Sequence, residues 1–255
     1  MKNLLIDWCQ AFRFLTRLPM GSREWVRRLS ASRPISNCAW VFPLVGLSVA
    51  GFSYGIYQCF IFFLPAQIAV ILMITAMIAV TGAFHEDGLA DCADGLGGKT
   101  VAERLVIMKD HRIGTYGGIA LILSLILRIQ LLLTIPAHLL LAVLVAEQMF
   151  SRTWMVAALR LGWWAKSTGL AVSFGQPKLW VVLVAFAISV ASLFIVWEWQ
   201  IAAIIITGCG VFFCLFIGAA KRVFGGITGD VVGALQQLLQ LVILFLIMIG
   251  QRFVN

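Results

Sequence analysis

Acidic residues cluster in one short stretch of an otherwise apolar chain. Of the eleven Asp and Glu residues, four fall within nine positions of the segment 84–95, FHEDGLADCADG. In a helix, Asp87, Asp91 and Asp94 stand at positions i, i+4 and i+7, which places their carboxylates within about 60° of one face. Three such charges repel each other unless a cation binds them, and ligands that are all oxygen favour Mg²⁺ or Mn²⁺ over zinc. The segment is therefore a candidate metal site, with a solvated acidic loop as the alternative.

The sequence MKDHRIGTYG, which begins at residue 108, forms a second polar cluster. Asp110 and His111 are candidates for general acid or base catalysis, because a histidine side chain titrates near neutral pH. Lys109 and Arg112 are candidates for phosphate binding. The alternative is that the positive charges only anchor the next helix on the cytoplasmic side of the membrane.

A third cluster, KRVFGGITGD, ends at Asp230. Its glycines allow a loop whose backbone N–H groups face an anion, and the start of the following helix adds a partial positive charge. The candidates for phosphate binding here are Lys221, Arg222, Gly225, Gly226 and Thr228. Asp230 suits two roles equally well, the N-cap of the following helix and a metal ligand.

Three charged residues fall inside apolar stretches, where charge is costly and usually functional. At 1.5 Å of rise per residue, Arg128 and Glu147 both lie roughly 20 Å from the cytoplasmic ends of their helices, so we expect them to pair. Arg152 lies roughly 12 Å deep by the same arithmetic and is a candidate for contact with a substrate phosphate.

Composition places the whole chain in a membrane. The 255 residues are 62% hydrophobic and 12% charged, and the mean hydropathy is +1.00. A soluble domain of this size could not cover itself with polar surface. The net charge of +8 does not indicate nucleic acid, because the basic residues flank apolar segments instead of forming a polar module. The six cysteines show no CxxC spacing, so we expect reduced packing residues.

The pattern of apolar segments predicts an all-α, polytopic membrane helix bundle, with residues 1–255 as a single domain. Residues 1–37 form a cytoplasmic interfacial segment with an amphipathic helix at 4–18, and residues 38–250 form the bundle. The expected spans are 38–63, 66–84, 114–135, 138–160, 179–197, 201–219 and 231–250.

The distribution of positive charge predicts the orientation. With seven spans, one side of the membrane receives segments 1–37, 85–113, 160–178 and 220–230, which carry seven, four, three and two Lys and Arg residues, 16 in total. The other side receives only Arg252. Because positive residues favour the cytoplasmic side, the N-terminus and the two candidate active-site loops, 85–113 and 220–230, are expected to be cytoplasmic. Taken together, the acidic cluster and the basic side chains that are candidates for phosphate binding indicate Mg²⁺-dependent transfer of a phosphoryl-linked group at that interface.

At these motifs the chain resembles the cobalamin (5′-phosphate) synthase family, also called adenosylcobinamide-GDP ribazoletransferases. The similarity runs nearly end to end, through residues 14–19, 42–46, 84–95, 107–117, 151–152 and 225–230. Its most specific block is F-H-x-D-G-L-A-D-x-x-D-G. The resemblance implies the last assembly step of the cobalamin nucleotide loop. In that step a hydroxyl of α-ribazole, or of its 5′-phosphate, attacks the phosphorus attached to cobinamide in adenosylcobinamide-GDP, and GMP leaves.

The resemblance also implies a Mg²⁺-dependent enzyme of the bacterial cytoplasmic membrane, and it leaves homo-oligomerisation open. Asp87, Asp91 and Asp94 would hold one or two Mg²⁺ ions on the diphosphate, with Asp230 as a further ligand. His85 or His111 would accept the proton of the attacking hydroxyl. The candidates for the substrate phosphates are Lys109, Arg112, Arg152, Lys221 and Arg222.

One departure from the family pattern concerns the helix after the third cluster. The family usually carries two glutamates where this chain has Gln237 and Gln240. If those glutamates help to bind metal, this chain has weaker ligands there. If they only face a neighbouring helix, nothing changes.

Two other classes of protein remain open at this point. A CDP-alcohol phosphotransferase also uses clustered aspartates, but its D-G-x-x-A-R pattern is absent, since Leu89, Ala90 and Asp91 follow Gly88. A cation transporter would need acidic residues near the bilayer midplane, whereas this cluster is expected at the interface.

Overall fold

The structure is a computed structural model that describes residues 2–20, 24, 34–110 and 112–254. Within these ranges the chain is helical apart from turns, loops and one isolated bridge between Trp164 and Ile227. The helices are α1 (Lys2–Leu15), η1 (Ile35–Val41), α3 (Phe42–Ile61), α4 (Ala66–Thr81), α5 (Phe84–Gly95), α6 (Val101–Ile107), α7 (Thr115–Thr134), η2 (Ala137–Leu139), α8 (Leu140–Leu161), α9 (Leu170–Phe174), α10 (Leu179–Val196), α11 (Trp199–Phe224) and α12 (Gly229–Val254).

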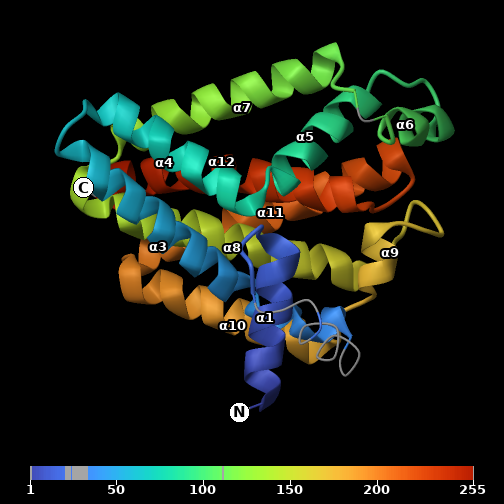
Figure 1. The fold of residues 1–255 in the computed structure, drawn as a ribbon, viewed down its shortest axis with the longest axis horizontal. Helices are drawn as coiled ribbons and strands as arrows, with labels where there is room; N and C mark the ends of the chain where they lie inside the picture. Colours follow the sequence, from blue (N-terminus) through green and yellow to red (C-terminus); the bar gives the residue numbers. More distant parts are fainter. Residues whose placement is uncertain (1, 21–23, 25–33, 111, 255) are drawn as a thin grey trace.

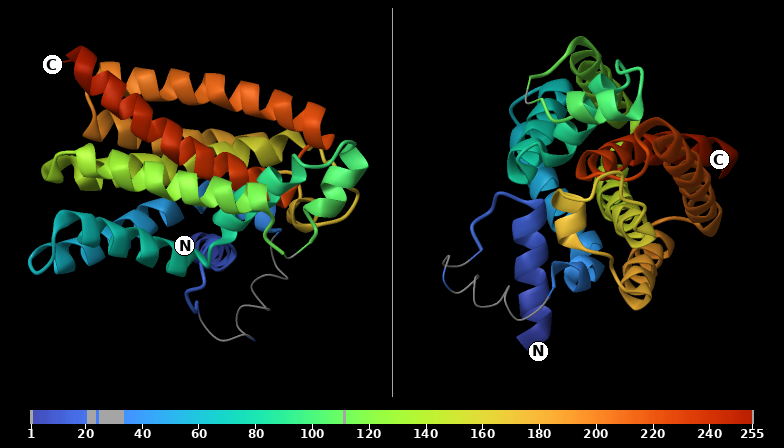
Figure 2. Two further views of the ribbon diagram at one scale, coloured as in Figure 1. Left: turned by 90° about the horizontal axis from the view of Figure 1, so that it is seen from above. Right: turned by 90° about the vertical axis from the view of Figure 1, so that its right-hand side faces the viewer.

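The long helices run along one direction and form a bundle around α8 and α12 (Figures 1 and 2). Helix α12 packs against α5, α8 and α11, while α8 also packs against α3 and α10. The outer surfaces carry apolar side chains, as on α7, where Ile119, Ile122 and Ile126 are each about half exposed. In water such a surface would be unstable, and a lipid environment accounts for it.

Among the described residues, six helices are long and apolar enough to cross a membrane, and a seventh span is present if the bent pair α4 and α5 counts as one. The direction of the chain alternates from helix to helix, as seven crossings require (Figure 1). The predicted all-α membrane bundle is therefore confirmed, and the predicted spans agree closely with the observed helices except at 66–84.

The expected span 66–84 ends early, at Thr81, and the chain turns by 89° into α5. The turn is made by Gly82 and Ala83, whose φ angles of 66° and 55° both lie in the left-handed region. Alanine reaches this region only at a cost in free energy, so the surrounding contacts must hold it there. One such contact is the bond from the Arg17 N–H to the Val80 carbonyl, at 2.7 Å. The expected loop 85–113 therefore begins with helix α5.

Helix α1 overlaps the predicted helix at 4–18 but ends at Leu15, and it runs across the long helices (Figure 1). Its inner face is anchored to η1, because Asp7 accepts hydrogen bonds from the Trp40 indole N–H at 2.8 Å and from the Cys38 thiol at 3.2 Å. Its Leu4 and Leu5 side chains are more than half exposed. This arrangement suits a helix that lies on a membrane surface.

Most of the segments expected on one side of the membrane lie at one end of the bundle. The end of α5, helix α6, helix α9 and the turn from α11 to α12 are at the right of Figure 1. The turn from α3 to α4 and the C-terminus are at the left. Within the described residues, the candidate catalytic segments thus share one end of the molecule.

Candidate active site

The acidic face of α5 reaches α12 through a contact between two glycines. Gly88 on α5 faces Gly233 on α12, and a Cβ atom on Gly233 would lie 3.4 Å from the Gly88 Cα atom. A Cβ atom on Gly88 would lie 2.7 Å from the Asp230 carbonyl oxygen, closer than packing allows. The absence of side chains therefore lets the two helices cross closely, with the first turn of α12 beside the first turn of α5.

This crossing brings Asp87 and Asp91 close to Asp230. The Asp87 and Asp230 carboxylates are near enough to repel each other, and the charges of Asp91 and Asp230 both act on the Cys92 thiol. Asp87 is exposed, whereas Asp91 and Asp230 are half-buried. Three of the four predicted metal ligands thus come together where two helices cross, although Asp230 lies 139 positions after Asp91 and 143 positions after Asp87 in the sequence.

Asp94, the fourth predicted ligand, is engaged elsewhere. Its two carboxylate oxygens accept hydrogen bonds from the backbone N–H groups of Gly114 and Gly117, at 2.7 and 2.8 Å. These amides belong to the first turn of α7, where a negative charge is favourable. In this conformation Asp94 fastens α5 to α7, and a metal would have to share it with these amides.

The structure therefore fits a divalent cation in part. The nearby donors are carboxylate oxygens, which hard cations prefer. Among the described residues, however, no three His, Cys, Asp or Glu side chains are already arranged to hold an ion. Asp87, Asp91 and Asp230 are the residues that would hold Mg²⁺, and when bound it would withdraw charge from phosphoryl oxygens.

The expectation that Asp230 caps α12 is not what the structure shows. The cap is Thr228, whose hydroxyl accepts the Val231 N–H at 3.2 Å and donates to the Asp230 carboxylate at 3.3 Å. Gly225 and Gly226 precede it with φ angles of 77° and 149°, so the glycine-rich turn does form. The Asp230 side chain therefore lies on the first turn of the helix, where its backbone meets Gly88 of α5.

The basic candidates occupy several places around this end. Lys221 is exposed and lies over the Trp163 ring at 4.6 Å, and Arg222 is exposed beside it. Lys109 and Asp110 are exposed after α6, and the Asp110 carboxylate accepts the Arg112 N–H at 3.1 Å. His111 lies outside the described residues. Among the described residues, Lys109, Asp110 and Arg112 form no hydrogen bond or ion pair with Asp87 or Asp230.

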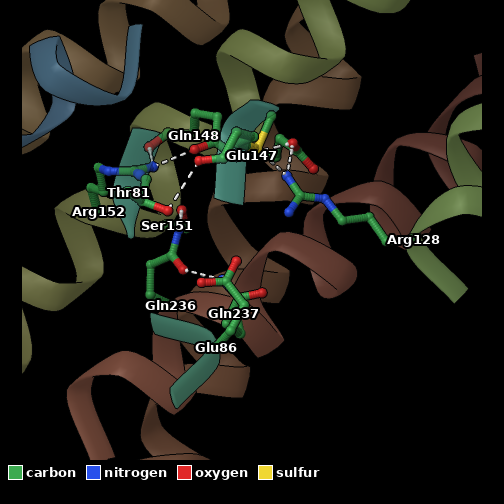
Figure 3. Close-up of polar contacts among 10 residues, drawn as sticks. Thr81, Glu86, Arg128, Glu147, Gln148, Ser151, Arg152, Gln236 and Gln237 are labelled. Carbon is green, nitrogen blue, oxygen red and sulfur yellow. Dashed lines mark hydrogen bonds and ion pairs between the residues drawn. The ribbon is translucent and has the colours of Figure 1, made fainter. Parts of the chain in front are cut away.

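A second polar group lies inside the bundle, among α4, α5, α7, α8 and α12 (Figure 3). Each side chain is at most 9% exposed. The members are Thr81, His85, Glu86, Arg128, Glu147, Gln148, Ser151, Arg152, Gln236, Gln237 and Gln240. We call this set the interior cluster. Its two arginines and two glutamates balance in charge, as buried ions require.

Two sequence candidates, Arg152 and His85, belong to the interior cluster. Arg152 donates to the backbone carbonyl of Gln148 at 3.1 Å and to the side-chain oxygen of the same residue. His85 is 1% exposed, and its Nε2 atom has no hydrogen-bond partner among the described residues. In this conformation neither side chain reaches the surface where Asp87 lies, so their predicted contact with substrate remains a prediction.

The predicted pair of Arg128 and Glu147 is confirmed as an ion pair, with the two side chains 3% and 0% exposed. The glutamines that depart from the family pattern also lie in the interior cluster. Gln237 donates to the Glu86 carboxylate at 3.0 Å, which links α12 to the first turn of α5 (Figure 3). Glu86 was not selected from the sequence, because its partners come from distant helices.

The sequence analysis also did not select the segment 163–172 as part of the site. It lies against the glycine-rich turn, where Ala165 N–H donates to the Ile227 carbonyl at 3.0 Å. Its Lys166 is close enough to Asp230 to act on that carboxylate. A lysine in a connecting segment has no local signal of function, since only the folded chain brings it to the acidic residues.

Comparison with known proteins shows the family of the chain. The family model described as cobalamin-5-phosphate synthase matches residues 7–248. Proteins named adenosylcobinamide-GDP ribazoletransferase are similar along most of their length. The protein from Shewanella halifaxensis is 34% identical, with 89% of this chain and 88% of the relative covered. The protein from Xanthobacter autotrophicus is 37% identical, with 95% and 96% covered.

The protein of that name from Bradyrhizobium diazoefficiens is 36% identical, with 96% of this chain and 94% of the relative covered. No solved structure matches the chain. The acidic block on α5 and the glycine-rich turn before α12 both fall inside the matched range. The chain therefore belongs to the cobalamin-5-phosphate synthase family.

Proposed function

We propose that this protein is a Mg²⁺-dependent adenosylcobinamide-GDP ribazoletransferase that works at the cytoplasmic face of the bacterial inner membrane. Its substrates are adenosylcobinamide-GDP and α-ribazole or α-ribazole 5′-phosphate. Family membership supports the reaction, and relatives carry this enzyme's name. The observation that carries the proposal is the crossing of α5 and α12, which gathers Asp87, Asp91 and Asp230 at one end of a membrane bundle.

The reaction exchanges one phosphorus–oxygen bond for another. A hydroxyl oxygen of α-ribazole bonds to the phosphorus attached to cobinamide, and the bond from that phosphorus to the GMP oxygen breaks. GMP leaves with the electron pair of the broken bond. The proton of the hydroxyl passes to a base. The candidates for this base are Asp110, His111 and His85. Asp110 is exposed in the segment after α6.

The acidic crossing would serve this reaction through Mg²⁺, which when bound neutralises charge on the diphosphate. Contacts within the protein fix the positions of the helices that carry these acidic residues. The glycine contact fixes the distance between the two helices, and Thr228 fixes the first turn of α12. Asp94 fixes α5 against α7. Such preorganisation lowers the free energy needed to align the groups during the reaction.

The orientation of the site follows from charge. Sixteen Lys and Arg residues lie in the segments assigned to the site's side of the membrane, against one on the other side. Positive residues concentrate in cytoplasmic loops, which supports a cytoplasmic site.

The test is release of GMP from adenosylcobinamide-GDP by detergent-solubilised protein, with and without α-ribazole. The proposal predicts release that requires both α-ribazole and Mg²⁺. A CDP-alcohol phosphotransferase would instead release CMP from a CDP-alcohol, and a transporter would release neither nucleotide. Absence of GMP from folded, monodisperse protein supplied with both substrates and Mg²⁺ would contradict the proposal.

A further inference from the structure

A small cleft lies beside the acidic crossing, between the segment 166–172 and the start of α12. Its volume is about 80 Å³, and its polar lining includes Lys166, Thr168, Thr228 and Asp230. A volume of roughly 10–15 Å³ on the same measure holds one water molecule. The cleft therefore has room for a group of several heavy atoms.

The walls of the cleft are fixed by backbone contacts. Ile227 N–H donates to the Trp163 carbonyl at 2.6 Å, and Ala165 N–H donates back to the Ile227 carbonyl. This pairing depends on Gly226, where a Cβ atom would lie 2.3 Å from the Trp163 carbonyl oxygen. The segment that carries Lys166 is thus held against the glycine-rich turn, and the position of the cleft relative to Asp230 is set by the fold.

Lys166 is the only basic side chain among the described residues that line the cleft. It is half-buried, and its positive charge acts on both Asp230 and Cys92. A lysine ammonium has three N–H donors and binds phosphoryl oxygens as a compact charge. The Thr168 hydroxyl adds a donor of the kind that phosphates accept.

We propose that this cleft is a phosphoryl-binding subsite in which Lys166 and Thr168 hold a phosphate group of a substrate. The inference rests on the proposed function and deepens it. Two phosphates are candidates, the 5′-phosphate of α-ribazole 5′-phosphate and the diphosphate of adenosylcobinamide-GDP. A phosphate bound at Lys166 lies next to Asp230, so the subsite orders one substrate relative to the acidic crossing.

The test compares Lys166→Met with wild-type protein, using α-ribazole and α-ribazole 5′-phosphate in turn as the acceptor. If the cleft holds the acceptor's phosphate, KM for the phosphorylated acceptor rises about tenfold or more, the scale of one lost charge-assisted hydrogen bond, while KM for α-ribazole changes little. If it holds the donor's diphosphate, KM for adenosylcobinamide-GDP rises with both acceptors. Either result supports the subsite, and the pattern identifies which phosphate it binds.

Lys178→Met is the matched control, because Lys178 is exposed, follows the same connecting segment and does not line the cleft. It should leave every KM unchanged, and Lys166→Arg should restore much of the lost affinity. If Lys166 is only a counter-ion of Asp230, KM values for all three substrates stay within about twofold of wild type, and the inference is overturned.

Thr168→Val provides a second test of the subsite if Lys166→Met does not fold. It removes one hydroxyl from the cleft, and the proposal predicts the same selective rise in KM, by a smaller factor. Unchanged KM values in both variants would reject the subsite. Wild-type protein that releases no GMP with either acceptor would instead reject the proposed function, so the two failures are distinguishable.

Discussion

At the scale of single residues, the acidic side chains occupy two different environments. Asp87, Asp91 and Asp230 gather at a polar end of the bundle and are at least partly exposed. Glu86 and Glu147 are buried among glutamine and arginine side chains. A buried carboxylate is tolerated only with such partners, whereas carboxylates that reach the surface can meet a cation from solution. The structure thus separates residues suited to chemistry from residues that hold the helices.

The ion pair of Arg128 and Glu147 gives a prediction at this scale. Removing one partner leaves a buried charge alone, which typically costs about 3–5 kcal/mol, while replacing both removes the charge altogether. We expect Arg128→Leu with Glu147→Leu together to be at least as stable in detergent as either single change. The measurement is the melting temperature of all four proteins. Losses that simply add would show that the two side chains do not depend on each other.

At the scale of elements, the crossing of α5 and α12 determines the geometry of the site. Gly88 and Gly233 allow the two helices to approach closely. The left-handed turn at Gly82 and Ala83 directs α5 towards α12. Asp94 ties α5 to α7. The hydrogen bond from Gln237 to Glu86, two members of the interior cluster, holds the first turn of α5 against α12. One backbone turn and three sets of contacts therefore hold this short helix in place.

We expect Gly88→Ala to lower both activity and thermal stability. The new methyl group would meet the Asp230 backbone at 2.7 Å, and overpacking of this kind typically costs about 1–3 kcal/mol. The separation of α5 from α12 would increase, so GMP release should fall further than stability alone explains. Melting temperature and GMP release of the same preparation check this.

Gly51→Ala is the matched control for that substitution. Gly51 also lies in a helix, α3, but a Cβ atom there meets nothing within 4 Å. The change should be neutral or slightly stabilising, because alanine favours helix by up to about 1 kcal/mol over glycine. Equal effects of Gly88→Ala and Gly51→Ala would show that the crossing does not require glycine.

The elements also show which features a sequence can predict. Hydrophobic length predicted most of the long helices, and the spacing of Asp87, Asp91 and Asp94 predicted one helix face, because both signals are local. The ends of α4, the capping of α7 by Asp94 and the approach of Lys166 to Asp230 were not predicted. They depend on contacts between segments far apart in the chain, which periodicity does not record.

Local contacts describe Arg152 and Asp230, and the contact of Arg152 with a substrate phosphate stays a prediction. Arg152 was predicted to face a phosphate because intramembrane charge is usually functional. The structure places it beside Gln148, a partner one helical turn away on the same helix. Asp230 was considered as an N-cap, but Thr228 takes that role two residues earlier. In each case a side chain nearby in the sequence, Gln148 or Thr228, makes a contact that composition alone did not identify.

At the scale of the whole molecule, the chain passes back and forth so that the candidate segments meet at one end (Figure 1). The charge asymmetry of 16 to 1 predicts that this end is cytoplasmic. A cysteine introduced at position 99, in protein lacking its native cysteines, should therefore resist a membrane-impermeant reagent in intact cells. A cysteine at position 63, in the turn from α3 to α4, should react. Labelling of position 99 from outside would contradict the orientation.

The central claim is that the acidic face of α5 binds Mg²⁺ for transfer of ribazole. Asp91 is the middle acidic residue of that face, and Asp91→Asn removes its charge while nearly preserving its size. Loss of charge stabilisation in the transition state typically lowers the rate about 10²–10³-fold. A residue that only supports the fold would lower the melting temperature and leave the specific activity of folded protein near normal.

The most direct measurement is therefore GMP release by folded, monodisperse Asp91→Asn protein across a Mg²⁺ titration, with its melting temperature measured alongside. We predict a protein with near-wild-type melting temperature, at least about 10²-fold slower release at saturating Mg²⁺, and a higher Mg²⁺ requirement for the activity that remains. Wild-type rates at low Mg²⁺ would contradict the account.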